Sequence, residues 1–199
     1  MLQRLEIQKQ VFKPIMPEKL PPLWAMEKYF NFYENELKPS MAGFVLQPLD
    51  GMHGLNTHTS AVVLRGIDYA LHIGRDPMPV VFACAFHDIS RINDNWDTEH
   101  GRNAIPNAIK IMKKFPDLFD KDTRLSIYSA IMNHTTGAAA PDYISACLWD
   151  ADRTRLSWKY GFEEKFFNTQ RGKYVAQHYK SFLEFQAHYF PQLKNSKEY

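Results

Sequence analysis

The chain has 199 residues, of which 45% are hydrophobic and 23% charged, and its 24 basic and 22 acidic side chains leave a net charge of +2. This composition is typical of a globular protein and excludes general disorder. The small net charge argues against a nucleic-acid partner, and no apolar run reaches the length of about 20 residues that spans a bilayer.

The two cysteines, Cys84 and Cys147, both lie in apolar runs. This placement argues against a disulfide scaffold and for a reducing compartment. The first ten residues are too polar for a signal peptide. We therefore expect a soluble, cytoplasmic protein that has no membrane partner.

Taken in chain order, the sequence predicts a proline-containing lead-in over residues 1–22 and then a series of helices. Apolar side chains at helical spacing predict helices over residues 23–37, 56–73, 76–86, 98–115, 122–134 and 141–157. The fourth of these follows a polar loop over residues 90–98. We find no convincing strand pattern and no internal repeat, so the predicted fold is an all-α, single-domain helical bundle.

Prolines and glycines mark the expected helix ends. Pro39 ends the first helix, Gly74 stops the second, and Gly137 closes the fifth. Pro106 is expected to kink or split its helix, because its ring removes one backbone hydrogen bond.

The apolar run over residues 80–86 predicts a buried central helix. Beyond residue 157 the chain is rich in aromatic side chains, and one helical stripe there predicts packing into the core. The stripe consists of Val175, Tyr179, Phe182, Gln186 and Tyr189. We therefore divide the chain into the lead-in, a core over residues 23–157, and an aromatic segment over residues 158–199 that completes the same domain.

The pair His87-Asp88 stands at the end of the buried helix and is the strongest chemical signal. A buried, unpaired charge is costly, and the negative end of the helix dipole favours a cation at this place. Four further candidates lie at a helix end or on a core face of other helices: His58, His100, His134 and Asp152. Imidazole and carboxylate ligands suit Fe, Mn, Co, Ni or Zn, and Mg²⁺ less well.

The order His58, His87-Asp88, Asp152 resembles the H…HD…D signature of the HD-domain superfamily of metal-dependent phosphohydrolases. Phe86-His87-Asp88-Ile89 is similar to the second-helix motif of that family, and the stretch over residues 150–156 is similar to its closing Ala-Asp-Arg-Leu pattern. The resemblance covers residues 53–156.

This resemblance implies that His58, His87, Asp88 and Asp152 hold one divalent metal, with His100 and His134 added in members that bind two. If one ion binds, His100 and His134 serve instead as proton donors or phosphate contacts. We place the first ligand at His58 rather than His53, because the family has it at a helix start. We place the last at Asp152 rather than Asp150, because the residues around it match the family.

The chemistry implied is hydrolysis of a phosphate mono- or diester of a small metabolite or nucleotide. A divalent metal lowers the pKa of a bound water and polarises phosphoryl oxygens. Four side chains are candidates for substrate binding or catalysis: Arg91, Arg65, Glu99 and Arg155. Some nucleotidases of the family carry glutamate where this chain has Arg91, which argues against that activity.

Two other classes of function compete with the hydrolase. The ligand set also resembles the di-iron oxygenases that share the HD fold and use O₂. A non-catalytic helical module that binds a metal or a nucleotide is the third alternative. His72, His178 and His188 are assigned no ligand role, and the oligomeric state is left open.

Overall fold

The computed structural model describes residues 21–135 and 139–193. These residues form helices, turns and loops, with no β-strand among them, which confirms the all-α class. Residues 1–20 of the predicted lead-in, and Gly137, lie outside the described residues.

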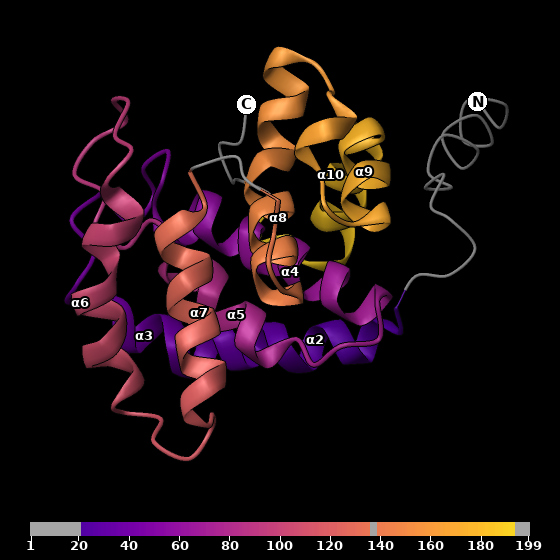
Figure 1. Ribbon diagram of the computed structural model, residues 1–199. Coiled ribbons are helices and arrows are strands. Elements are labelled where there is room, and N and C mark those ends of the chain that lie inside the picture. The colour runs from indigo at the N-terminus through magenta and orange to yellow at the C-terminus, as the bar shows by residue number, and fades with distance from the viewer. Residues whose placement is uncertain (1–20, 136–138, 194–199) are drawn as a thin grey trace, which may run out of the picture.

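The described helices follow one another from α2 to η4, and two of the short segments are π-helical turns, η1 and η2. Their bounds are α2 (Leu23–Phe32), η1 (Tyr33–Leu37), α3 (Lys38–Met41), η2 (Leu55–Thr59), α4 (Ser60–His72), α5 (Met78–Phe86), α6 (His100–Met112), α7 (Lys121–Asn133), α8 (Tyr143–Tyr160), η3 (Glu164–Phe166), α9 (Gln170–Gln177), α10 (Tyr179–Tyr189) and η4 (Pro191–Leu193). Helices α6 and α7 lie side by side at the left of Figure 1, and α9 packs beside α8 at the right.

Helix α5 is the centre of the bundle, as its apolar sequence predicts. Every side chain from Pro79 to Phe86 is buried, and the helix packs against α4, α7 and α8. Burying each large apolar side chain contributes roughly 1.5–3 kcal/mol. The chain stays buried from α5 through Ile89, so the residues that directly follow the helix lie inside the molecule.

The expected helix end at Pro39 is wrong, and so is the expected split at Pro106. The first helix does not end at Pro39, because the π-turn η1 shifts the hydrogen bonding, with the Lys38 N–H bonded to the carbonyl of Tyr33, and α3 then continues to Met41. Pro106 does not split α6. It lies on the exposed face, where water can satisfy the carbonyl that loses its partner.

The glycine stop after the second predicted helix is confirmed. Gly74 has φ +68, a conformation that side chains with a Cβ rarely adopt, and the helix ends at the residues just before it.

The aromatic segment packs against the same core as the rest of the chain. It forms two helices, α9 and α10, with a break at His178, rather than a single continuous helix. Four side chains of the predicted stripe are buried, whereas Tyr189 is 41% exposed. The ring of Phe190, just beyond α10, lies 5.2 Å from the ring of Phe30 in α2.

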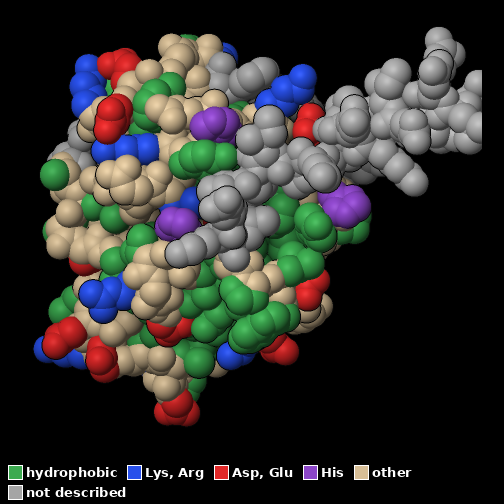
Figure 2. All heavy atoms as spheres, turned by 90° about the vertical axis from the view of Figure 1, so that its right-hand side faces the viewer, with side chains coloured by type: hydrophobic (Ala, Val, Ile, Leu, Met, Phe, Trp, Pro, Cys, Tyr) green, Lys and Arg blue, Asp and Glu red, His purple; other side chains and the backbone are tan. Residues whose placement is uncertain are grey.

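On the face that Figure 2 presents, hydrophobic side chains gather in the lower half, and charged side chains of both signs are scattered around them. No helix in residues 21–135 or 139–193 has the length and apolar character needed to cross a membrane.

Candidate metal centre

Five helical elements bring their ends or inner faces to one buried point. His58 lies in η2, where the chain bends at Thr57 before α4 begins. His87 and Asp88 follow α5 directly, and His100 is the first residue of α6. The remaining two, His134 and Asp152, come from the residue after α7 and from within α8.

Asp88 lies at the middle of this group, and its side chain is only 4% exposed. Its Oδ2 lies 3.3 Å from Nε2 of His87 and 3.8 Å from Nε2 of His58. Its Oδ1 lies 3.0 Å from Nε2 of His100 and 3.9 Å from Nε2 of His134. The two carboxylate oxygens of one residue therefore face two different pairs of histidines.

Asp152 adds a second carboxylate beside the pair His58 and His87. Its Oδ1 lies 3.0 Å from Nε2 of His58 and 3.7 Å from Nε2 of His87. Two groups of three have ligand atoms close enough to hold one ion each: His58, His87 and Asp152 form one, and Asp88, His100 and His134 form the other.

Backbone carbonyls fix the orientation of three of the imidazole rings. Nδ1 of His87 lies 2.7 Å from the carbonyl of Cys84, and Nδ1 of His134 lies 2.6 Å from that of Ile131. His100 makes the corresponding contact with Asp97. With Nδ1–H donating to the backbone, the Nε2 lone pair of each ring points into the centre, as in known metal sites.

The close approach of α6 and α7 depends on Gly101. A Cβ at this position would lie 2.5 Å from the carbonyl of Ile131 and 2.9 Å from Nδ1 of His134. Without the side chain, Nε2 of His100 and Nε2 of His134 come to 2.7 Å. The glycine that follows His100 therefore allows the two rings to meet.

The charges of the centre shift the pKa values of its members in opposite directions. Burial lowers the pKa of His87, but the negative charges of Asp88 and Asp152 outweigh burial and raise it to about 9. Burial, together with the charge of His87, lowers the pKa of His134 to about 4. The pKa values of both carboxyl groups lie well below the usual range, because the histidines outweigh the effect of burial.

The donor set fits a divalent transition metal. Four imidazole nitrogens and two ionised carboxylates converge, and two pairs of nitrogens lie within 2.7 and 3.3 Å of each other. Nitrogen atoms at such distances repel unless a proton or a cation lies between them. A centre of borderline-soft nitrogen ligands and hard oxygen ligands suits Mn, Fe, Co, Ni or Zn.

The four candidates for substrate binding occupy different environments. Arg91 lies at the centre: its Nη1 is 3.9 Å from Oδ1 of Asp88 and 3.3 Å from Nδ1 of His100. Its Nε and Nη2 donate to the carbonyls of Asn93 and Asn95, so the same side chain holds the loop after α5.

The structure does not bring Arg65 or Glu99 to the centre. Arg65 is fully buried and donates to the carbonyl of Ala151, which places it between α4 and α8 rather than beside a substrate. Glu99 has an exposed side chain that pairs with Arg102 at 3.5 Å, away from the buried cluster. The roles of Arg65 and Glu99 in substrate binding or catalysis stay predictions. Arg155 lies one turn beyond Asp152 on α8, and its Nη1 is buried without a hydrogen-bond partner.

The two residue choices of the sequence analysis differ in outcome. Asp150 lies away from the centre and binds the segment before α9, so choosing Asp152 agrees with the structure. His53 and His58, in contrast, both reach the centre, because Nδ1 of His53 lies 2.9 Å from Oδ2 of Asp88. Gly54, between the two histidines, lets the chain pass close to the preceding loop, because a Cβ there would clash with the carbonyl oxygen of Leu49.

The fold and the site together define an all-α protein with a buried histidine–aspartate centre that could hold metal ions. Comparison with protein-family models, with curated proteins and with solved structures finds no match to this chain.

Proposed function

We propose that this chain is a metal-dependent phosphohydrolase of the HD type, which hydrolyses a phosphate mono- or diester of a small metabolite or nucleotide. The observation that carries the proposal is the position of Asp88 between two pairs of histidines, with one carboxylate oxygen toward each pair. A carboxylate in this position can bridge two divalent ions.

Bound divalent ions would activate a water and polarise the phosphoryl group of the ester. The side chains around Asp88 would hold the two ions. His58, His87 and Asp152 would bind on the Oδ2 side of Asp88, and His100 and His134 on its Oδ1 side. Because both groups of three are complete in the structure, the proposal favours two ions over one.

Arg91 supplies the positive charge that an anionic substrate needs. Its side chain is 12% exposed and lies next to His100 and Asp88, so its guanidinium can reach a phosphoryl oxygen bound on that side. The net charge of +2 provides no broad attraction, so we expect a small substrate that is held by the ions and a few arginines.

The test begins with protein purified without added metal and analysed for its metal content. After chelation and reloading with Mn²⁺, we expect release of inorganic phosphate from an aryl phosphate, or of the aryl alcohol from a bis-aryl phosphodiester. His188→Gln is the matched control, because His188 is exposed and lies in α10. Absence of turnover on monoesters, diesters and nucleotides with every metal would contradict the proposal.

The same centre supports a second candidate, an HD-fold di-iron oxygenase. Four imidazoles around a shared carboxylate are a ligand set that iron also accepts. Iron in the purified protein, and an optical band that appears when the reduced protein is exposed to air, would favour this activity. Metal-dependent thermal stability with neither activity would indicate a non-catalytic module.

A further inference from the structure

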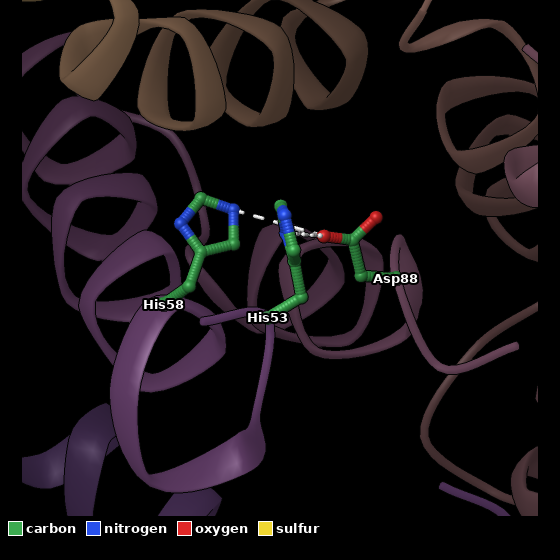
Figure 3. A group of neighbouring side chains, drawn as sticks. All are labelled: His53, His58 and Asp88. Atoms are coloured by element: carbon green, nitrogen blue, oxygen red, sulfur yellow. Dashed lines mark hydrogen bonds and ion pairs between the residues drawn. The ribbon is translucent and has the colours of Figure 1, made fainter. Parts of the chain in front are cut away.

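His53 lies in the loop between α3 and η2 and reaches the metal centre from outside the HD motif. Its side chain is 13% exposed, and Nδ1 lies 2.9 Å from Oδ2 of Asp88. Figure 3 shows its ring between His58 and Asp88, with both histidines turned toward the same carboxylate oxygen. His53, His58 and Asp88 form a third group whose ligand atoms are close enough to hold an ion.

The outer nitrogen of His53 also has a partner of the type that metal-binding histidines use. Nε2 lies 3.6 Å from Oδ1 of Asp94, in the loop between α5 and α6. A histidine that binds a metal usually donates its other ring N–H to a carboxylate or a backbone carbonyl. In the structure Nδ1 of His53 donates to the ionised carboxylate of Asp88, and a ring with its proton on Nε2 instead, toward Asp94, would offer the Nδ1 lone pair to an ion.

His53 therefore repeats the arrangement of the other rings with the two nitrogens exchanged. In His87 and His134, Nδ1 bonds to a backbone carbonyl and Nε2 faces the centre. In His53, Nε2 faces outward to a carboxylate and Nδ1 faces the centre. Each of these rings has one nitrogen toward a group outside the centre and one toward the ion position, although the contact of His53 with Asp94 is an ion-pair distance and not a hydrogen bond.

We propose that His53 is a fifth histidine ligand of the centre and binds the ion on the Oδ2 side of Asp88. The inference rests on the proposed metal centre. It makes the two ion positions unequal. One position has the donors His53, His58, His87, Asp88 and Asp152, and the other has only Asp88, His100 and His134.

This inequality assigns different roles to the two positions. A catalytic metal needs an open coordination position for water or substrate, whereas a position filled by protein donors is closed. The position at His100 and His134 therefore receives the water and the substrate. Arg91 supports this assignment, because its guanidinium lies beside His100.

The test uses the full chain loaded with Co²⁺. Each Co²⁺-bound histidine gives one strongly shifted, exchangeable ring N–H signal in the proton NMR spectrum. We expect five such signals in the wild-type protein, four in the His53→Gln variant, and five in the His188→Gln control. Four signals in the wild-type protein would show that His53 only donates a hydrogen bond to Asp88, which overturns the inference even if the variant fails to fold.

A Co²⁺ titration provides the second readout. In His53→Gln we expect one of the two binding steps to weaken by about 10- to 100-fold and the other to stay unchanged. In Asp94→Asn we expect all five shifted N–H signals to remain and the same Co²⁺ binding step to weaken by less than in His53→Gln. Two unchanged binding steps in His53→Gln would overturn the inference.

Neither readout uses turnover, so the two proposals can fail separately. Five shifted signals without phosphate release would keep His53 as a ligand and contradict the hydrolase. Four signals with phosphate release would support the hydrolase and contradict His53 as a ligand. A chain that binds no Co²⁺ would contradict both.

Discussion

Helix α8 carries two carboxylates, the buried Asp150 and the half-buried Asp152, that serve two different polar clusters. Side chains two positions apart on a helix point about 200° apart, so Asp150 and Asp152 face opposite sides of α8. Asp152 belongs to the candidate metal centre. Asp150 belongs to a second cluster, here called the anchoring cluster, which ties the segment before α9 and α9 itself to α4 and α8. Its members are Asp68, Asp150, Asn168, Thr169 and Arg171.

The anchoring cluster satisfies its own carboxylates. Asp150 accepts the backbone N–H groups of Asn168 at 2.8 Å and Thr169 at 2.7 Å, and bonds to both side chains as well. Asp68 accepts two hydrogen bonds from Arg171, at 2.7 and 3.1 Å. Every carboxylate oxygen in it therefore has a donor from the chain.

The metal centre is built differently, because nitrogen atoms in it face other nitrogen atoms. Nε2 of His100 lies 2.7 Å from Nε2 of His134, and the corresponding atoms of His58 and His87 are 3.3 Å apart. A proton can relieve one such contact, but a divalent ion relieves several at once. Buried carboxylates whose oxygens all have donors indicate a structural role, and buried nitrogens with surplus lone pairs indicate a ligand from outside the chain.

The largest expected effect is that of Asp88→Ala on metal binding and activity. Because Asp88 serves both ion positions, its loss should remove both ions and lower turnover by roughly 1,000-fold, equivalent to several kcal/mol. Metal analysis and the phosphate-release assay measure this change. The metal-free variant should still fold, as judged by circular dichroism. Full metal content in the folded variant would mean that the centre is assigned to the wrong residues.

Breaking the anchoring cluster should affect stability without affecting metal binding. Asp68→Asn leaves the charge of Arg171 buried without a counter-ion, which costs about 3–5 kcal/mol of unfolding free energy. Urea unfolding measures the loss, and metal analysis of the folded protein should give wild-type content. As a control, replacing both partners by apolar residues (Asp68→Leu with Arg171→Met) should recover most of the loss. A reduced metal content in Asp68→Asn would show that the clusters are coupled.

Asp150→Ala and Asp152→Ala form a matched pair on one helix. Asp150→Ala leaves the buried N–H of Thr169 without an acceptor, so we expect a loss of about 1–3 kcal/mol in unfolding free energy and no loss of metal. Asp152→Ala should lower the metal affinity and leave the stability of the metal-free protein nearly unchanged. If Asp150→Ala lowers the metal affinity as well, the opposite-face separation of the two aspartates is wrong.

The sequence predicts the fold better than it predicts which polar residues meet. The helical spacing and the all-apolar run of α5 depend on local periodicity, which is readable without tertiary contacts. The environment of Arg65 could not be predicted from periodicity. A residue two turns after His58 can face either the core or the pocket at the same helical spacing. The structure buries it against the carbonyl of Ala151.

His53 lies in the loop before η2, and its contact with Asp88 could not be predicted. That contact depends on how the loop over residues 42–54 folds back across the end of α5, and loop conformation has no periodic signature. The histidines and Asp88 of the candidate centre were readable because each stands at or next to a helix end, whereas Asp152 lies within α8. The pairing of the two Asp88 oxygens with different histidines depends on tertiary packing alone.

The smallest expected effect is the pH dependence of metal binding, and it comes from His87. In the metal-free protein the pKa of His87 is raised to about 9, because Asp88 and Asp152 outweigh burial. An ion must displace this proton at neutral pH. The apparent metal affinity should therefore rise by about tenfold per pH unit from pH 7.5 toward pH 9 and then level off.

The metal-free protein should show the opposite trend over the same range. A pKa raised in the folded state means that protonated His87 stabilises the fold, fully at a pH below the unfolded value near 6.5 and progressively less as the pH rises through about 9. His134 adds no proton in this range, because its pKa is lowered to about 4. Metal titrations in buffers of different ionisation enthalpy count the released protons. One proton per protein at pH 8 is expected, and none would show that His87 is neutral before the ion binds.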